Sequence, residues 1–264
     1  MPKIFSTNKL KYIAVIAMTI DHMAWVFVPN TSTAFYVLHL IGRLTAPIMA
    51  YFIAEGFFYT SNEKRYVMRL FVFWIVSCIP YSLLFNNGFP IEIYQNVLQS
   101  ADKLFVYHNM KLYINVVSHN LTILIRLKTN VIFTLFLGLL TPIVIQSEKL
   151  NALLKVFIVS GICLLSFFGD WSYFMVLFIF IFYYFRDNNN IKWVLYYCVC
   201  LIYLTSIQEK TDLIKFGILF APIVLLMYNG KKGSNNKFNK WFFYFYYPVH
   251  LLLLYLLKKV FLLD

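Results

Sequence analysis

Apolar runs dominate this chain, and many of them are long enough to cross a lipid bilayer or nearly so. A helix needs about 20 residues to span roughly 30 Å of hydrocarbon, and fewer when it packs inside a bundle. Of the 264 residues, 61% are hydrophobic and 13% are charged, whereas soluble domains have about half and about a quarter. A water-soluble fold of this length would expose large apolar patches. We therefore predict an all-α, polytopic integral membrane protein with about nine transmembrane helices (8–10), forming a single domain over residues 1–264.

The predicted spans are residues 10–28, 34–59, 66–85, 131–145, 152–168, 171–185, 191–207, 213–228 and 242–261. With the N-terminus in the cytoplasm, most of the 23 Lys and Arg residues fall on the inner side, as the positive-inside rule requires. The long segment 86–130 is then an extracytoplasmic loop or an interfacial helix. The predicted location is the bacterial cytoplasmic (inner) membrane, crossed several times.

Several classes of function are excluded by what the sequence carries. The net charge is +12, but the basic residues form no continuous tract, so we expect contact with membrane lipids and no binding to nucleic acid. The four cysteines lie within apolar segments and form no C-x-x-C pair, which indicates buried thiols and no metal site. The signatures of zinc proteases, serine hydrolases and nucleotide-driven pumps do not occur in the chain.

Ionisable side chains inside the apolar spans are unfavourable, and by default they indicate a functional site. These are Asp21 and His22 in the first span, Arg43 in the second and His250 in the last. At 1.5 Å per residue, each lies about 15 or 16 Å from a polar end of its span, which is about half of the hydrocarbon core. We predict that they meet near the membrane midplane as catalytic residues. The structural alternatives are an Asp21–Arg43 ion pair that locks two helices and a His250 side chain that bridges two helices.

His39 and Glu55, also in the second span, are predicted to contact substrate. His39 lies one turn from Arg43 on the same helical face, and therefore on the same expected cavity wall. Glu55 lies about 18 Å further along the helix axis, near the inner end. The alternative for Glu55 is an ion pair with Lys64 or Arg65 at the inner interface.

Two kinds of chemistry fit this set of residues. A histidine beside a carboxylate is a unit of general base catalysis, and a buried guanidinium can stabilise an oxyanion. With basic inner loops, this favours acyl transfer from a phosphorylated cytoplasmic donor. It is equally compatible with a proton-coupled transporter or flippase that binds an anion at midplane.

Short motifs that cover nearly the whole chain add information. In chain order they are Leu10-Lys11-Tyr12-Ile13 with Asp21-His22, Ile41-Gly42-Arg43-Leu44 with Pro47, Glu55-Gly56-Phe57, Arg65 with Arg69, Ile79-Pro80-Tyr81, Asn130-Val131 with Gly138, Tyr228-Asn229-Gly230-Lys231-Lys232-Gly233, and Tyr247-Pro248-Val249-His250-Leu251. This ordered set resembles the TraX family of bacterial membrane acetyltransferases. Asp170-Trp171-Ser172 stands where the family pattern has Asp-Tyr-Gly.

The resemblance implies an enzyme that takes acetyl from acetyl-CoA and acetylates the N-terminal amine of a membrane-inserted pilin subunit. It also implies kinship with wider transmembrane acyltransferases that acetylate extracytoplasmic sugars, so a hydroxyl of a cell-envelope glycan is the alternative acceptor. Tyr247, in the closing motif, is expected to contact substrate. No metal is expected.

The expected mechanism assigns a role to each group. The phosphates of CoA are expected to bind the basic residues at the inner mouth, namely Lys64, Arg65, Arg69, Lys231 and Lys232. His22, oriented by Asp21, is expected to act as the general base. Arg43, with His250, is expected to stabilise the tetrahedral oxyanion. An acyl-histidine intermediate on His22 or His250 is the alternative chemistry.

Overall fold

The computed structural model describes residues 2–85, 129–205, 210–234 and 237–261, and these are organised as helices with no named strand among them. The helices are α1 (Thr7–Phe27), α2 (Thr33–Gly42), α3 (Thr45–Phe58), α4 (Glu63–Phe85), α7 (Val131–Gln146), α8 (Ala152–Ser166), α9 (Ser172–Tyr184), α10 (Asn189–Leu204), the 3-10 helix η1 (Lys210–Phe220), α11 (Ala221–Leu226) and α12 (Lys237–Phe261). The all-helical prediction is confirmed for this part of the chain. The predicted loop or interfacial helix at 86–130 lies almost entirely outside it.

Two of the predicted spans are interrupted. The second is broken at Arg43 and Leu44, where α2 ends and α3 begins. The eighth consists of η1 followed by the short helix α11. Within the described residues, three helical segments are long and apolar enough to cross a membrane: Thr7–Phe27, Thr33–Phe58 with its internal break, and Glu63–Phe85. Helices α7, α8 and α9 are apolar but shorter.

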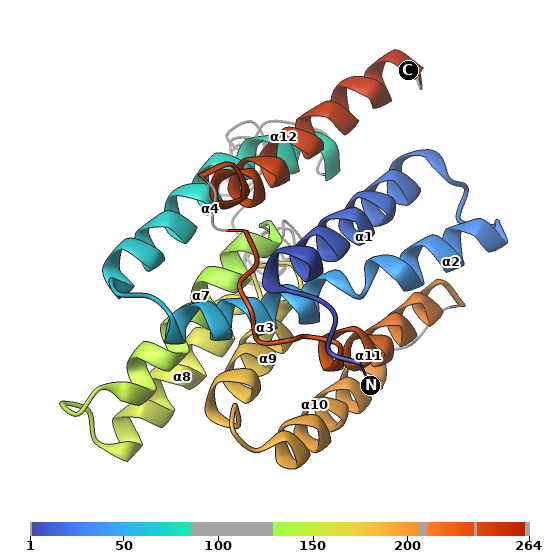
Figure 1. Cartoon of the computed structure of the whole chain (residues 1–264). Helices are drawn as coiled ribbons and strands as arrows, with labels where there is room; N and C mark the ends of the chain where they lie inside the picture. Colours follow the sequence, from blue (N-terminus) through green and yellow to red (C-terminus); the bar gives the residue numbers. More distant parts are fainter. Residues whose placement is uncertain (1, 86–128, 206–209, 235–236, 262–264) are drawn as a thin grey trace, which may run out of the picture.

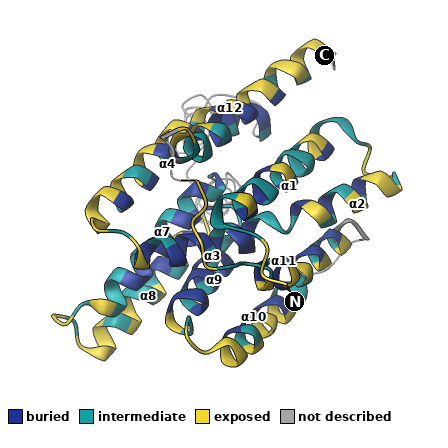
Figure 2. Cartoon of the chain, in the orientation of Figure 1, coloured by how far each residue is buried: buried dark blue, intermediate teal, exposed yellow. Residues whose placement is uncertain are grey.

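Helix α3 lies at the centre of the molecule (Figure 1) and contacts α1, α7, α9 and α11. Its buried residues fall on almost every side of the helix, as the dark ribbon of α3, α7 and α9 shows (Figure 2). Ala46, Ala50 and Ala54 recur every four residues, and small side chains let neighbouring helices approach closely. The outer helix α8 is different, because Leu153 and Phe157 are 80% and 75% exposed. Such an apolar outer surface suits contact with lipid.

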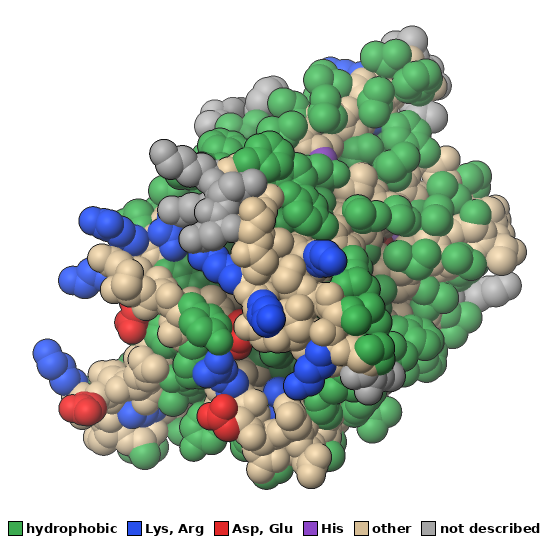
Figure 3. Space-filling view, viewed as in Figure 1, with side chains coloured by type: hydrophobic (Ala, Val, Ile, Leu, Met, Phe, Trp, Pro, Cys, Tyr) green, Lys and Arg blue, Asp and Glu red, His purple; other side chains and the backbone are tan. Residues whose placement is uncertain are grey.

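Charged and apolar side chains separate on the surface. In Figure 3 most Lys, Arg, Asp and Glu side chains gather toward the lower left, and hydrophobic side chains cover most of the remainder of that face. The connections α3–α4 and α7–α8 lie at the lower-left end in Figure 1, whereas the connection α1–α2 and the C-terminus lie at the upper right. Helices α1, α4 and α12 all run from the first end toward the second. We refer to the lower-left end as the charged end.

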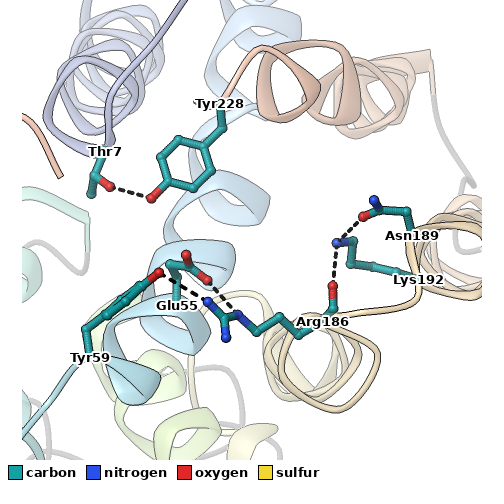
Figure 4. Close-up of polar contacts among 7 residues, drawn as sticks. All are labelled: Thr7, Glu55, Tyr59, Arg186, Asn189, Lys192 and Tyr228. Atoms are coloured by element: carbon teal, nitrogen blue, oxygen red, sulfur yellow. Dashed lines mark hydrogen bonds and ion pairs between the residues drawn. The ribbon is translucent and has the colours of Figure 1, made fainter. Parts of the chain in front are cut away.

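The N-terminal segment is tied to the segment that precedes α12. The backbone N–H of Phe5 donates to the Met227 carbonyl at 3.0 Å, and the N–H of Thr7 donates to the Lys231 carbonyl at 2.9 Å. The hydroxyls of Thr7 and Tyr228 are 2.9 Å apart (Figure 4). These bonds hold the 227–232 segment beside the first turns of α1.

Glu55 is buried close to this contact. Its Oε2 accepts from Nε of Arg186 at 3.3 Å, and the same guanidinium donates to the Tyr59 hydroxyl at 3.2 Å (Figure 4). The alternative for Glu55, an ion pair with Lys64 or Arg65, is therefore wrong. Both of those side chains are exposed, whereas the turn after α9 brings Arg186 back to the end of α3.

A close approach between η1 and α2 generates a stability prediction. A Cβ on Gly217 would overlap the Leu40 carbonyl oxygen and lie 2.8 Å from Cβ of Arg43. A Cβ on Gly161 in α8 would meet nothing within 4 Å. We expect Gly217→Ala to destabilise the protein by about 1–3 kcal/mol through overpacking, and Gly161→Ala to stabilise it by roughly 0.5–1 kcal/mol because Ala favours a helix.

The measurement is the midpoint of thermal unfolding of both variants in the same detergent. Equal midpoints for the two variants would contradict the close packing of η1 against α2.

Candidate functional site

A cavity of about 560 Å³ lies between α1, α3, α4 and α12, within the usual size range of small-molecule sites. Its ionisable lining consists of the following side chains: Lys11, Asp21, His22, Arg43, Tyr66, Arg69, Tyr81, Asp170, Lys232, Tyr244, Tyr246 and Tyr247. Because α1, α4 and α12 run in the same direction, these residues sort along one axis (Figure 1). Lys11 and Arg69, in the first turns of α1 and α4, lie toward the charged end, and His22 lies about 16 Å further along α1.

His22 forms a direct pair with His250. Nδ1 of His22 and Nε2 of His250 are 2.8 Å apart, and the two rings are nearly parallel, at 2°. Nδ1 of His250 lies 2.9 Å from the carbonyl oxygen of Tyr246. A carbonyl only accepts, so the His250 Nδ1 carries a proton and, in the neutral ring, its Nε2 accepts one from His22. This network leaves Nε2 of His22 as the nitrogen with a free lone pair.

We expected Asp21 to orient His22, but the structure shows a different partner for Asp21. Its Oδ1 instead accepts from Nδ1 of His39 at 2.7 Å. Within the described residues, the ion pair formed by Asp21 is with His39 and not with Arg43, so the locking Asp21–Arg43 pair is also not found. His39 is completely buried and lies behind Asp21, not on the cavity wall itself.

Arg43 lies at the break between α2 and α3 and lines the same cavity. Its side chain is hydrogen-bonded to Tyr203, and its guanidinium carbon lies 5.4 Å from the centre of the Trp171 ring. Nε of Arg43 is buried and has no hydrogen-bond partner among the described residues. A buried donor of this kind is available to an acceptor brought by a ligand.

Asp170 and Trp171 complete the wall around Arg43, and the sequence analysis did not assign them to the site. Trp171 and Ser172 have φ of 65° and 47°, a left-handed conformation that is uncommon for residues other than glycine. The N–H of Trp171 donates to Oδ1 of Asp170 at 3.0 Å, and its ring stacks on Tyr203. Strained backbone of this kind clusters at functional sites. The one sequence signal was the departure from Asp-Tyr-Gly at these positions.

Three cationic side chains, Lys11, Arg69 and Lys232, line the part of the cavity nearest the charged end, which we call its mouth. Arg69 and Lys232 line it as predicted, and Arg69 donates to the Tyr244 hydroxyl at 3.2 Å. Lys11 joins them, with Nζ 5.7 Å from the ring centres of both Phe52 and Phe243. In the sequence, Lys11 belongs to the first of the ordered motifs, and we had predicted no role for it in binding.

The remaining predicted residues divide between the cavity and the surface. Tyr247 lines the cavity, and His250 is buried behind His22. Lys64, Arg65 and Lys231 are exposed and do not line the cavity, and Glu55 is engaged with Arg186 away from it. Among the residues that the structure describes, no group of three His, Cys, Asp or Glu side chains could hold a metal ion.

One known protein resembles this chain over most of its length, and another resembles a third of it. A probable fimbrial assembly protein of Dichelobacter nodosus, FimC of serogroup H1, is 29% identical over 259 residues, which cover 95% of this chain and 94% of that protein. The uncharacterized protein RP591 of Rickettsia prowazekii (strain Madrid E) is 29% identical over 85 residues, 32% of each chain. No solved structure matches.

The family described as TraX protein matches two overlapping segments, residues 6–124 and 112–258. These matches agree with the ordered motifs of the sequence and cover the helices that line the cavity. The chain therefore belongs to the TraX family.

Proposed function

We propose that the protein is a membrane-embedded acetyltransferase that moves an acetyl group from acetyl-CoA to an acceptor amine or hydroxyl. One observation carries the proposal. A single cavity joins a mouth with three cations to a buried cluster that contains a histidine base and a free guanidinium donor. A phosphorylated acyl donor needs cations for its phosphates at one end of the cavity and catalytic groups for its acyl carbon at the other.

The orientation in the membrane follows from the charges. The helices cross the inner membrane of a bacterium with the N-terminus in the cytoplasm, so that the charged end and the mouth face the cytoplasm. Acetyl-CoA is made and held there, whereas an acceptor inserted in the membrane reaches the other end. The described exposed apolar faces of α8, α10 and α12 then contact lipid.

The mouth suits a polyanionic ligand. Lys11, Arg69 and Lys232 converge on it, and no described carboxylate forms an ion pair with any of them. Like charges held together repel, and phosphate groups relieve that repulsion. Beyond the mouth the wall becomes apolar, with Val15 and Phe73 among its members. We assign the mouth to the phosphates of CoA and the apolar stretch to its pantetheine arm.

The deep cluster then performs the transfer. Nε2 of His22 takes a proton from the acceptor nitrogen or oxygen as that atom attacks the thioester carbonyl carbon. Arg43 stabilises the oxyanion of the tetrahedral intermediate, for which its unpartnered Nε is suited. The carbon–sulfur bond then breaks, and CoA leaves as the thiolate or, after it takes up a proton, as the thiol.

The family and its relatives favour a pilin-like acceptor. The TraX resemblance implies acetylation of a pilin N-terminal amine, and the Dichelobacter nodosus relative is named as a probable fimbrial assembly protein. We therefore propose the N-terminal amine of a membrane-inserted, pilin-like polypeptide as the acceptor, with the hydroxyl of an envelope glycan as the alternative.

The first prediction concerns the deep cluster. Purified protein in detergent should release CoA from acetyl-CoA in the presence of an acceptor peptide with a free N-terminal amine. His22→Ala should lower kcat by about 10²–10⁴-fold because the general base is lost, and Arg43→Ala by about 10²–10³-fold because an oxyanion donor is lost. Gly161→Ala, on the outer helix α8, is the control variant. It shows whether purification in detergent by itself changes the activity of a substituted protein.

The same assay separates an enzyme from a transporter. Wild-type protein that releases no CoA with peptide, glycan or membrane extract as acceptor would contradict the acetyltransferase. If that protein instead carried anions across vesicles in exchange for protons, the midplane cluster would be an ion pathway.

The second prediction concerns the mouth and uses two adjacent lysines as a matched pair. Lys232 lines the cavity, whereas Lys231 is exposed outside it. Lys232→Ala should raise the KM for acetyl-CoA by about 5- to 30-fold, in keeping with the loss of one charge-assisted hydrogen bond. Lys231→Ala, which removes the same charge, should raise it less than twofold, with kcat unchanged in both variants. Equal effects of the two substitutions on KM would contradict the assignment of the mouth.

A further inference from the structure

We propose that Asp21 is a positioning residue for Arg43, and that His39 and Gly42 hold its carboxylate in place for this task. The inference rests on the proposed acetyl transfer, in which Arg43 stabilises the oxyanion. It assigns Asp21 and its sequence neighbour His22 to different tasks. It also gives a role to His39, which lies behind the cavity wall, and to Gly42, which is part of that wall.

The Asp21 side chain is fitted against α2. Its Oδ1 accepts from His39 at 2.7 Å. A Cβ built on Gly42 would overlap Oδ1, Cβ and Cγ of Asp21, so a glycine at this position is what leaves room for the carboxylate. His39 and Gly42 are three residues apart and therefore share a face of α2.

His39 is held in a fixed orientation. It is 0% exposed, and its ring centre lies 4.2 Å from that of Phe35 and 4.6 Å from that of Trp25. Its Nε2 has no hydrogen-bond partner among the described residues, so the bond to Asp21 is its one polar contact there. An enclosed ring with one hydrogen bond can fix a carboxylate but cannot relay a proton to the cavity.

The charge of Asp21 acts on Arg43. Asp21 and Arg43 line the same cavity, and the Asp21 carboxylate packs against Gly42. Arg43 directly follows Gly42, so the same end of α2 receives the carboxylate and carries the guanidinium. Because the two form no direct ion pair, Asp21 can orient the guanidinium without occupying its donors.

His22 is oriented by a separate set of contacts. His250 holds its Nδ1, and the Tyr246 carbonyl holds His250. Two separate sets of direct contacts therefore converge on the cavity, one from α12 for the base and one from α2 for the oxyanion donor. Residues in different sets should contribute independently to the rate, and residues in the same set should not.

Double-mutant cycles on acetyl transfer test this separation. The isosteric substitution Asp21→Asn should lower kcat about 10- to 100-fold, as expected for a misplaced catalytic group. It should lower kcat by less than about threefold in an Arg43→Ala background, where nothing is left to position. In a His250→Ala background the full loss should persist. Unchanged thermal unfolding of Asp21→Asn keeps the comparison free of a folding defect.

A second pair of variants tests His39 independently. The amide N–H of His39→Asn can replace the Nδ1 donor, whereas His39→Leu removes it. We expect the Leu variant to follow Asp21→Asn in both backgrounds, and the Asn variant to recover most of the lost kcat.

Other results would overturn the inference. If Asp21→Asn couples to His250→Ala and is additive with Arg43→Ala, Asp21 serves the base, and the inference fails while the acetyltransferase stands. Equal kcat for the Asn and Leu variants at His39 would also contradict it. Wild-type protein with no acetyl transfer at all would contradict the proposed function, and the inference with it.

Discussion

The structure depends on one constraint, which is that ionisable groups within an apolar helical bundle must face one another or a shared cavity. An isolated charge in hydrocarbon is unfavourable by several kcal/mol. Helices α1, α2 and α12 meet this requirement through His22–His250 and Asp21–His39, and Arg43 meets it through Tyr203 and Trp171. The cavity lies where these side chains face one another. The helix packing that pairs the ionisable groups therefore also forms the site.

The break between α2 and α3 is the second feature on which the site depends. In a continuous helix over residues 33–58, Arg43 would lie in the middle of the helix, on its regular surface. The break instead places it at a helix end, where Gly217 of η1 packs against the Leu40 backbone and Gly42 receives Asp21. Interrupted helices at membrane depth are tolerated where they line a cavity, and this break contributes Gly42 and Arg43 to the cavity lining.

Several elements followed from the sequence, and others did not. The apolar runs correspond to helices. Of the four residues placed at one depth by counting, Asp21, His22 and Arg43 line one cavity, and His250 contacts His22 from behind its wall. The pairing within that set was predicted wrongly, since Asp21 contacts His39 and His22 contacts His250. Glu55 pairs with Arg186, which is 131 residues away, and no local spacing indicates such a contact. Lys11 and Asp170 lie in motifs noted in the sequence, but neither motif indicated that these residues line the cavity.

The sequence alone determined the helical class, the apolar lengths of the runs and the level of each ionisable residue. The reason is that a helix advances by a constant 1.5 Å per residue, so depth is a matter of counting. The tertiary structure alone decided which groups at that level touch. Contact depends on how far each helix is rotated about its axis and on which helices are neighbours, and both are set by packing between segments distant in the chain. The mouth formed by Lys11, Arg69 and Lys232 is therefore a product of the fold, although each of its charges can be found in the sequence.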